Sequence, residues 1–506
     1  MQAAWISEAL AASLERHSKE GLSRQLMRLL RQWISDGRLA GDTLLPASRE
    51  LAASLKVGRN TVLNAYEQLQ AEGYLSTRHG AGTYVTGLFR QRQQTPLPAR
   101  RLPLGLSARG ASLFASCGLP QGLSGAFAPG VPEIRQFPHH CWQQLLSRHQ
   151  RQAAPAMLNY TADGGLPALR EVLAEYLQLS RSVRCRPEQI LITNGAQQGL
   201  ELTTRLLADP GDIAWVEEPG YAGTHAAFRG AGLSLLPAPV DAEGLAPQRV
   251  TDPRPPRLIY TTPSHQYPSG VVMSLSRRLA LLQHAEQAQA WIIEDDYDSE
   301  FRYRSQPLPA LQGMAPDERV IYIGTFSKVM YPGLRIGYLV VPDALIDAFR
   351  SANARLYREG QYPVQAALAD FIAAGHFARH VRRMRELYRE RQQVLRQALA
   401  DSAAEQLALS PGEAGMHLVA GLPPGLQEQS LSQAAATQGV WLRPLARHYL
   451  ATPQQHGLVL GYAGVDQHAI RHGAQVLARL LQEQGKNDEQ ATTSDQRLPT
   501  GTTGTV

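Results

Sequence analysis

The sequence predicts a multi-domain α/β protein in which an N-terminal winged helix-turn-helix precedes a larger α/β domain. Three observations indicate this fold class. The chain has 506 residues, whereas a single hydrophobic core rarely grows beyond about 250–300 residues. Residues 22–87 hold three runs with helical spacing and then a hairpin pattern. From about residue 127 to 480, helical runs alternate with short β-rich runs such as QILITNG (189–195), the rhythm of a parallel sheet with crossover helices.

Charge is distributed unevenly along the chain. Residues 1–101 contain 14 Lys and Arg against 8 Asp and Glu, a net +6 that equals the excess of the whole chain (50 − 44). A basic block on a neutral body indicates that one end binds a polyanion, although a solvated basic surface without a partner is the simpler alternative. Three cysteines at unrelated spacings predict neither a disulfide framework nor a metal site. With no membrane-span or signal-peptide pattern, we expect a cytoplasmic protein.

The first helical run, residues 22–35, places leucines and Trp33 on one face. Two short helices follow at 48–55 and 59–73, and then a hairpin at 74–87. This order is that of a winged helix-turn-helix, whose second helix enters the DNA major groove. That helix starts with Arg59, Asn60 and Thr61, side chains that can bond guanine, adenine, and phosphate or a thymine methyl. The alternative is an ordinary helical hairpin with a polar start.

The segment LLPASRELAASLKVGRNTVLNAYEQLQAEGYLSTRHGAGTYV (44–85) closely resembles the GntR family of bacterial regulators. The resemblance implies a double-stranded DNA partner. It places Arg49 and Arg59 at DNA-contacting positions, with Asn60 and Thr61 beside them. His79 and Gly80 fall at the tip of the wing. We expect this domain to span residues 18–87.

The remaining boundaries follow from composition. Residues 88–126 are rich in Pro, Arg, Gln and Ser and lack clear periodicity, so we expect a linker. An effector domain should span 127–485. The last residues, 486–506, are polar and aperiodic, and we expect them to be disordered.

Lys328 is the most informative residue of the larger domain. It lies in GTFSKVMYPGLRIGYLVV (324–341), on a turn of small residues between two apolar runs. Arg335 follows it, and an acidic patch, EDDYDSEF (294–301), precedes it. Pyridoxal 5'-phosphate (PLP) requires such a set: a lysine that forms a Schiff base, a cation for the phosphate and a carboxylate for the pyridinium nitrogen. We assign that carboxylate to Asp295.

Five segments of this domain are similar, in order and spacing, to fold-type I, class I aminotransferases. They include NYTADGGLPALREVLAEYL (159–177), ITNGAQQGLEL (192–202) and EEPGYAG (217–223). The resemblance implies a fold-type I PLP-binding domain, with Tyr160 reaching the phosphate of a neighbouring subunit. Tyr267 departs from the family, because an asparagine normally stands there. The implied cofactor-binding residues are Lys328, Asp295, Tyr297, Tyr221, Arg335, Gly195, Ala196, Gln197, Thr325, Ser327 and Tyr160.

A GntR-type winged helix joined to such a domain resembles the MocR/GabR family of PLP-dependent regulators, over roughly residues 20–480. The resemblance implies a homodimer that senses an amino compound or PLP itself. Three functions compete: a ligand-sensing transcriptional regulator, an active aminotransferase with an added DNA-binding module, and an architectural dimer with a vestigial site.

We favour the regulator, with at most weak half-transamination. Aminotransferases of this class usually carry a substrate-carboxylate arginine in a strand near the C-terminus, but the corresponding LVLGYAG (458–464) has none. Arg443 or Arg447 is our candidate for an effector-binding replacement, because a guanidinium binds a carboxylate bidentately; the alternative is that both are surface arginines.

Overall fold

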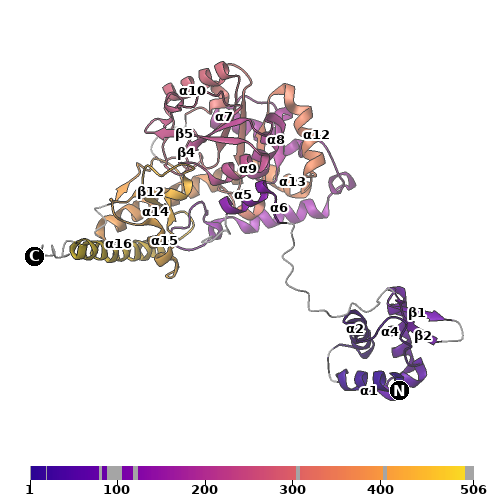
Figure 1. Cartoon of the computed structure of the whole chain (residues 1–506). Coiled ribbons are helices and arrows are strands. Elements are labelled where there is room, and N and C mark those ends of the chain that lie inside the picture. Colours follow the sequence, from indigo (N-terminus) through magenta and orange to yellow (C-terminus); the bar gives the residue numbers. More distant parts are fainter. Residues whose placement is uncertain are drawn as a thin grey trace, which may run out of the picture. The chain divides into compact units, whose positions relative to one another are not determined.

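The computed structural model describes residues 2–16, 18, 20–78, 82–87, 105–117, 124–303, 308–402 and 407–495. The chain divides into two compact units, Met1–Gly105 and Leu106–Val506 (Figure 1). Among the described residues, no helix combines the length and apolar composition that crossing a membrane requires.

The smaller unit has the predicted helix-turn-helix and hairpin (Figure 1). The hairpin strands are antiparallel, with Leu75 opposite Val85, and leucines of the helices form one core with these two residues. The elements are α1 (Gln2–Ser13), α2 (Leu22–Ser35), α3 (Ser48–Leu55), α4 (Arg59–Ala71), β1 (Leu75–Arg78) and β2 (Gly82–Val85).

Helix α1 extends this unit beyond the expected start at residue 18. Ile6 and Leu10 are fully buried in the core of the unit, and α1 packs against α3. The sequence did not predict this helix, because alanines are frequent in its segment QAAWISEALAAS. Few large apolar side chains are left there to set the periodicity that identifies longer amphipathic helices.

The described strands of the larger unit form one eight-stranded sheet in the order β3-β10-β9-β8-β7-β4-β5-β6. Its inner strands are parallel, as predicted, but β10 is antiparallel to both neighbours and β6 is antiparallel to β5. Strands β9 and β10 are joined without a crossover helix, so the chain turns back directly. The strands are β3 (Ile190–Thr193), β4 (Ile213–Glu218), β5 (Ser234–Asp241), β6 (Gly244–Leu245), β7 (Leu258–Thr261), β8 (Trp291–Asp296), β9 (Val320–Thr325) and β10 (Gly337–Val340).

Helices cover the sheet and bury its apolar side chains in several clusters. The central strands are continuous apolar runs for this reason. The helices are α5 (Ala108–Cys117), α6 (His139–Arg151), α7 (Pro167–Arg181), α8 (Ala196–Leu207), α9 (Ala222–Ala231), α10 (Leu275–Ala288), α11 (Leu311–Met314), α12 (Ile346–Leu356), α13 (Tyr362–Ala373) and α14 (His376–Asp401).

The C-terminal part adds a second sheet, which in the described residues has the order β11-β12-β14-β13. Its elements are β11 (Ala408–Leu409), β12 (His417–Gly421), α15 (Glu428–Ala436), β13 (Arg443–Pro444), β14 (Gly457–Gly461) and α16 (Gln467–Asp495). Helix α16 packs along α14.

Two further expected boundaries differ from the structure. Helix α5 lies within the segment expected to be a linker and packs against α9 (Figure 1); it is short and rich in small residues, so its pattern is inconspicuous. Helix α16 continues to Asp495, although we expected disorder from residue 486. Polar composition alone therefore did not locate the end of this helix.

Candidate functional site

The residues that we expect to contact DNA lie at the starts of two helices of the smaller unit that pack against each other. Arg59 is the first residue of α4, and Arg49 is in the first turn of α3. Both arginines and Asn60 are exposed, whereas Thr61 is half-buried and its carbonyl accepts a hydrogen bond from Ser23 at 3.2 Å. Because α3 and α4 are in contact, the structure places these candidates on one pair of packed helices. His79 and Gly80 lie outside the described residues.

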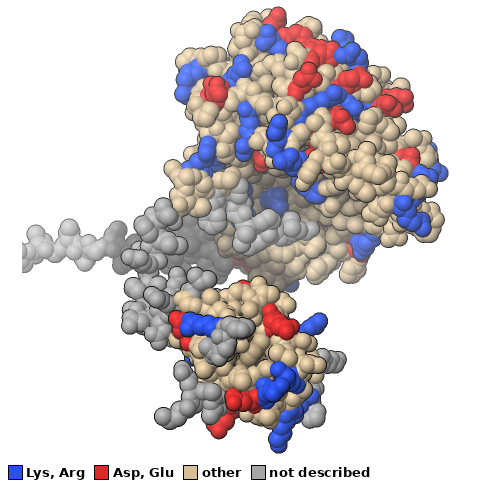
Figure 2. Space-filling view, turned by 90° about the vertical axis from the view of Figure 1, so that its right-hand side faces the viewer, with Lys and Arg blue, Asp and Glu red and all other residues tan. Residues whose placement is uncertain are grey.

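Several other arginines of this unit are neutralised. Arg31 makes a bidentate contact with Glu72, at 2.8 and 3.1 Å, and Arg78 pairs with Asp42 at 2.5 Å. Within the described residues, Arg49 and Arg59 have neither a hydrogen-bond partner nor an ion-pair partner. On the face of the larger unit that Figure 2 shows, basic and acidic side chains are interspersed. Free cations at α3 and α4 suit phosphate contacts.

Lys328 follows strand β9 at one edge of the large sheet. Its Nζ donates a hydrogen bond to the Gly130 carbonyl at 3.0 Å. Burial lowers the pKa of Lys328, assisted by Arg443 and Arg335 and opposed by Asp298 and Asp295. A lowered pKa leaves more of the amine neutral, and the neutral amine is the nucleophile.

Asp295 lies at the end of β8, on the same edge. Its Oδ2 accepts a hydrogen bond from the Tyr260 hydroxyl at 2.7 Å, whereas its buried Oδ1 has no partner in the part of the chain that the structure describes. Burial raises the pKa of Asp295 to about 7. A buried carboxylate oxygen without a partner is costly, so this atom is suited to a donor supplied by a bound molecule.

The neighbouring acidic residues serve the scaffold instead. Side chains alternate along a strand, and Glu294 accepts the backbone N–H groups of Leu311 and Gln312 at 2.9 and 2.8 Å. Asp296 forms a buried ion pair with Arg181 at 2.7 Å. The acidic run therefore contributes Asp295 to the site and fixes its strand through the residues on either side.

Three tyrosine side chains lie near Asp295. The Tyr297 hydroxyl lies 3.0 Å from Nδ1 of buried His265, which is also 3.0 Å from Asp298. Burial raises the pKa of Tyr297. The rings of Tyr221 and Tyr267 meet edge to face at 5.9 Å, and the charges of Asp295, Arg335 and Arg443 act on the Tyr221 hydroxyl.

An anion cradle lies beside Lys328. Gly195 has φ 93° and precedes α8, whose first residues are Ala196 and Gln197. A Cβ at Gly195 would approach Arg335 Nη2 at 3.2 Å, so glycine provides the close approach. Arg335 Nη2 donates to the Asn194 carbonyl at 2.7 Å. Helix N-terminal amides beside a guanidinium suit a phosphate.

The remaining expected residues divide between this cradle and the surface. The Thr325 hydroxyl accepts from the Ser327 backbone N–H at 3.2 Å, and the Gln197 side chain donates to the Gly223 carbonyl at 3.0 Å. Tyr160 is 76% exposed, with the Arg358 guanidinium 5.3 Å from the centre of its ring. Within the described chain, no hydrogen bond joins Tyr160 to Lys328.

The structure separates the two candidate effector arginines. Arg443 begins β13, opposite Val459 of β14, and it helps to lower the pKa of Lys328. It is half-buried and has no hydrogen-bond or ion-pair partner among the described residues. Arg447 is exposed. Arg443 thus lies on β13, next to β14. Strand β14 carries the start of LVLGYAG, the segment in which aminotransferases of this class usually have their substrate-carboxylate arginine. Arg447 lies at the surface.

These residues fit PLP. The unpartnered Oδ1 of Asp295 can accept from a pyridinium N–H, the cradle at Gly195 and Arg335 can hold a phosphate, and Lys328 can hold the aldehyde carbon. Sequence reasoning missed Gly130, Tyr260 and His265. Only the histidine had a local signal, because it lies in the motif TTPSHQYPSG (261–270).

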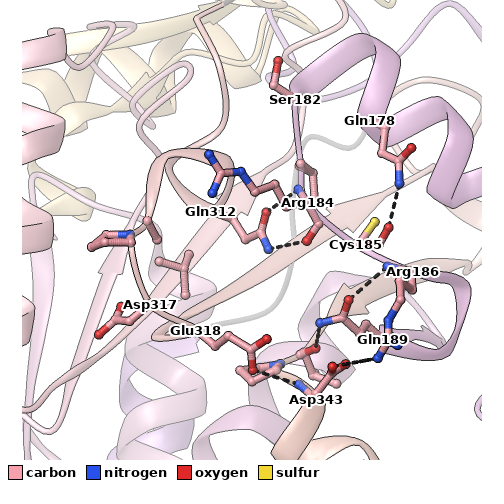
Figure 3. A pocket seen from close by; sticks show the side chains of 16 residues that line it. Gln178, Ser182, Arg184, Cys185, Arg186, Gln189, Gln312, Asp317, Glu318 and Asp343 are labelled. Carbon is pink, nitrogen blue, oxygen red and sulfur yellow. Dashed lines mark hydrogen bonds and ion pairs between the residues drawn. The ribbon is translucent and has the colours of Figure 1, made fainter.

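A hollow of about 680 Å³ lies at the opposite edge of the sheet. It is lined by residues before β3 and β9 and after β10 (Figure 3). Its polar groups pair with one another: Gln312 bonds the backbone of Arg184, and Arg186 bonds Asp343. None of the buried, unpartnered atoms in the described residues lines it. Nor do the described residues contain a cluster of His, Cys, Asp or Glu that could hold a metal ion.

Each of the two parts of the chain matches a known protein family. Residues 22–85 match the family described as bacterial regulatory proteins, gntR family, and residues 133–477 match aminotransferase class I and II. The chain is 44% identical over 467 residues to the "Probable rhizopine catabolism regulatory protein MocR" of Rhizobium meliloti, covering 91% of this chain and 94% of that protein.

A second relative is the "HTH-type pyridoxine biosynthesis transcriptional regulator PdxR" of Corynebacterium glutamicum, at 32% identity over 91% of this chain and 96% of that protein. Among solved structures, LysN, an α-aminoadipate aminotransferase from Thermus thermophilus, aligns with a TM-score of 0.66 and 28% identity. That alignment covers 75% of this chain and 95% of LysN, which was solved with N-(5'-phosphopyridoxyl)-L-leucine. The chain therefore belongs to the MocR-type transcriptional regulators, in which a GntR-family DNA-binding domain is joined to an aminotransferase domain whose cofactor is PLP.

Proposed function

We propose that this regulator holds PLP at Lys328 and uses that site to sense an amino compound or PLP itself. The observation that carries the proposal is the buried, unpartnered Oδ1 of Asp295, on the same sheet edge as Lys328. PLP, when bound, supplies an aldehyde that reacts with primary amines and a ring that withdraws electrons. In this chain Asp295 would accept the ring N–H, and the phosphate would be surrounded by Gly195, Ala196, Thr325, Ser327 and Arg335.

Arg443 supports an effector that carries an anionic group as well as an amine. Its half-buried guanidinium has no partner among the described residues, and its charge reaches Lys328. A carboxylate would satisfy that guanidinium bidentately, while the amine would lie toward Lys328. The printed names of the relatives refer to rhizopine catabolism and to pyridoxine biosynthesis, so they do not single out one effector class for this chain.

We further propose a homodimer that works in the cytoplasm, where chromosomal DNA lies. Leu158 and Tyr160 are 71% and 76% exposed, and neighbouring exposed apolar side chains often mark an interface between subunits. Efficient aminotransferase turnover is not part of the proposal, because Val459 and Leu460 of β14 are apolar and fully buried. Lys328 nevertheless has the lowered pKa that proton transfer needs, which is compatible with slow half-transamination.

The test is binding of the purified protein to DNA upstream of its own gene, by fluorescence anisotropy at fixed salt, because phosphate contacts make affinity strongly salt-dependent. Wild type and Lys328→Ala are compared with and without PLP. Arg254→Ala, which removes an exposed cation of the larger unit, is the control for loss of one positive charge.

We expect specific binding in both Lys328 forms and a PLP-dependent change only where Lys328 is present. Binding that is indifferent to PLP, or that responds equally in Lys328→Ala, would refute sensing through Lys328. Absence of specific binding together with turnover of about 1 s⁻¹ or faster, an ordinary enzyme rate, would favour the aminotransferase instead.

A further inference from the structure

The acceptor of the Lys328 hydrogen bond belongs to a distant segment of the chain. Gly130, whose carbonyl lies 3.0 Å from Lys328 Nζ, has φ 73°. The segment before it is fixed to the second sheet, the one that contains β13 and β14. The backbone N–H of Trp441 donates to the Ala126 carbonyl at 2.9 Å, and the backbone N–H of Gly461 donates to the Phe127 carbonyl at 3.0 Å. The position of the Gly130 carbonyl therefore depends on how this segment is held on its other side.

Glu133 holds that other side. It is 3% exposed, and its Oε2 pairs with Nη2 of buried Arg391 at 2.6 Å. Its backbone N–H donates to the Tyr388 hydroxyl at 2.9 Å, and Arg391 Nη1 donates to the Ala463 carbonyl. The pair thus joins segment 130–133 to helix α14 and to the end of β14.

We propose that Glu133 and Arg391 are positioning residues for Lys328, because their buried ion pair fixes the segment whose Gly130 carbonyl holds the lysine amine. The inference deepens the proposed function and rests on Lys328 as the PLP-holding residue. Removing one member of a buried ion pair leaves the other charge uncompensated, so segment 130–133 would rearrange and the carbonyl would move away from Nζ.

The direction of the effect on Lys328 follows from its surroundings. A carbonyl accepts a stronger hydrogen bond from an ammonium than from a neutral amine, so loss of the Gly130 acceptor lowers the pKa of the lysine further. The charged groups that act on Lys328 are Asp298, Asp295, Arg443 and Arg335, and none of them changes in the variants below.

Glu133 has two charged neighbours, Arg391 and Arg135. Arg135 is exposed, and its Nε lies 3.0 Å from Glu133 Oε1. Asp466 acts on Arg135 from the start of α16. Arg135 remains in every variant but lies at the surface, where water screens its charge, so it does not replace the buried bond from Arg391.

The experiment measures the amine directly in the cofactor-free, full-length protein. Trace acetylation with acetic anhydride is followed by peptide mass spectrometry over a range of pH, which gives the pKa of each lysine. The other lysines are Lys19, Lys56 and Lys486, and exposed Lys56 in the other unit is the internal reference. The rate of PLP attachment, read from absorbance, is a second readout.

For Glu133→Gln and Arg391→Met, we expect the Lys328 midpoint to fall by about one pH unit, the scale of one lost charge-assisted hydrogen bond. At a pH above both midpoints, where the amine is neutral in every variant, PLP attachment should slow about tenfold, because the amine is no longer held in position. Glu133→Asp keeps the carboxylate and should recover most of both values. Arg277→Gln breaks another ion pair of this unit, with Asp241 at 3.1 Å, and should move neither.

A purely structural role predicts a different result: lower melting temperatures with an unchanged Lys328 midpoint in both variants, which would overturn the proposal. An equal shift in Arg277→Gln would overturn it as well. If Glu133→Gln does not fold, Gly130→Ala tests the contact directly, because the added Cβ would lie 3.1 Å from Lys328 Nζ. An unchanged Lys328 midpoint in Gly130→Ala would also overturn the proposal. Acetylation needs no PLP, so a protein that fails to bind PLP would refute the proposed function without deciding this inference.

Discussion

Asp295→Asn should stabilise the cofactor-free protein at alkaline pH and weaken its binding of PLP. Burial raises the pKa of Asp295 from 3.8 to about 7. One pKa unit corresponds to about 1.4 kcal/mol, so keeping this carboxyl ionised in the fold costs ~4 kcal/mol. Asparagine avoids that cost, because its amide oxygen can accept the Tyr260 hydrogen bond that Oδ2 now accepts.

The sign of the pH dependence follows from proton binding. Between about pH 4 and about pH 7 the folded state keeps the Asp295 proton and the unfolded state has lost it. The contribution of Asp295 to the free energy of unfolding therefore falls as pH rises through this window. The variant lacks this loss, so its advantage over wild type should be near zero at the acid end and largest above about pH 7.

Urea unfolding of both cofactor-free proteins, followed by circular dichroism across this pH range, measures the difference. Asp252→Asn is the control, because the Arg254 side chain lowers the pKa of Asp252 to about 2. This carboxyl is ionised in both states across the range, so the stability difference of that variant should not change with pH. In PLP titrations the Asp295 variant should bind about 10–100-fold more weakly, since a charge-assisted hydrogen bond is lost. A stability difference that is constant with pH, or unchanged PLP affinity, would refute the assignment.

Three further outcomes are expected. Arg443→Gln should weaken binding of an anionic amino effector about tenfold or more, and Arg447→Gln should not; calorimetric titration distinguishes the two, and equal effects would contradict the separation of these arginines. Arg59→Ala should cost about 1–3 kcal/mol in operator binding, measured by anisotropy at fixed salt, and an unchanged affinity would remove it from the interface. Leu10→Ala should destabilise the DNA-binding unit by about 2–5 kcal/mol, seen as a lower melting temperature of that unit; no change would mean that α1 is not part of its core.

Local motifs explain why much of the site could be predicted from the sequence. Lys328 and Arg335 belong to one turn and the loop after it, and Asp295 lies near the end of an apolar strand. In a parallel sheet, strand ends of the same direction meet at one edge, so strands and motif order were enough to expect these side chains near one another. The antiparallel β10 did not disturb this arrangement, because Arg335 precedes it in the loop at the same edge.

Residues that reach the site through distant packing carried no such signal. Gly130 lies far from Lys328 in sequence and arrives because segment 126–133 is fixed between β14 and α14. Tyr260 looked like one apolar residue of a strand, and only the register of β7 with β8 brings its hydroxyl to Asp295. Helix α1 shows the same limit in the other unit, since alanine-rich segments bury few large side chains.

The charge of the site itself argues for an effector with an anionic group. Arg335 and Arg443 both act on Lys328, whereas of the two carboxyl groups that oppose them, Asp298 is already engaged by His265 and Asp295 has a pKa raised to about 7. The site therefore has an excess of cationic groups that bound anions would relieve. A phosphate in the cradle at Gly195 would satisfy Arg335, at the helix N-terminus that also favours it. Arg443, on β13 beside β14, would still have no partner among the described residues, so we propose that the effector carries a second anionic group, which this guanidinium would bind.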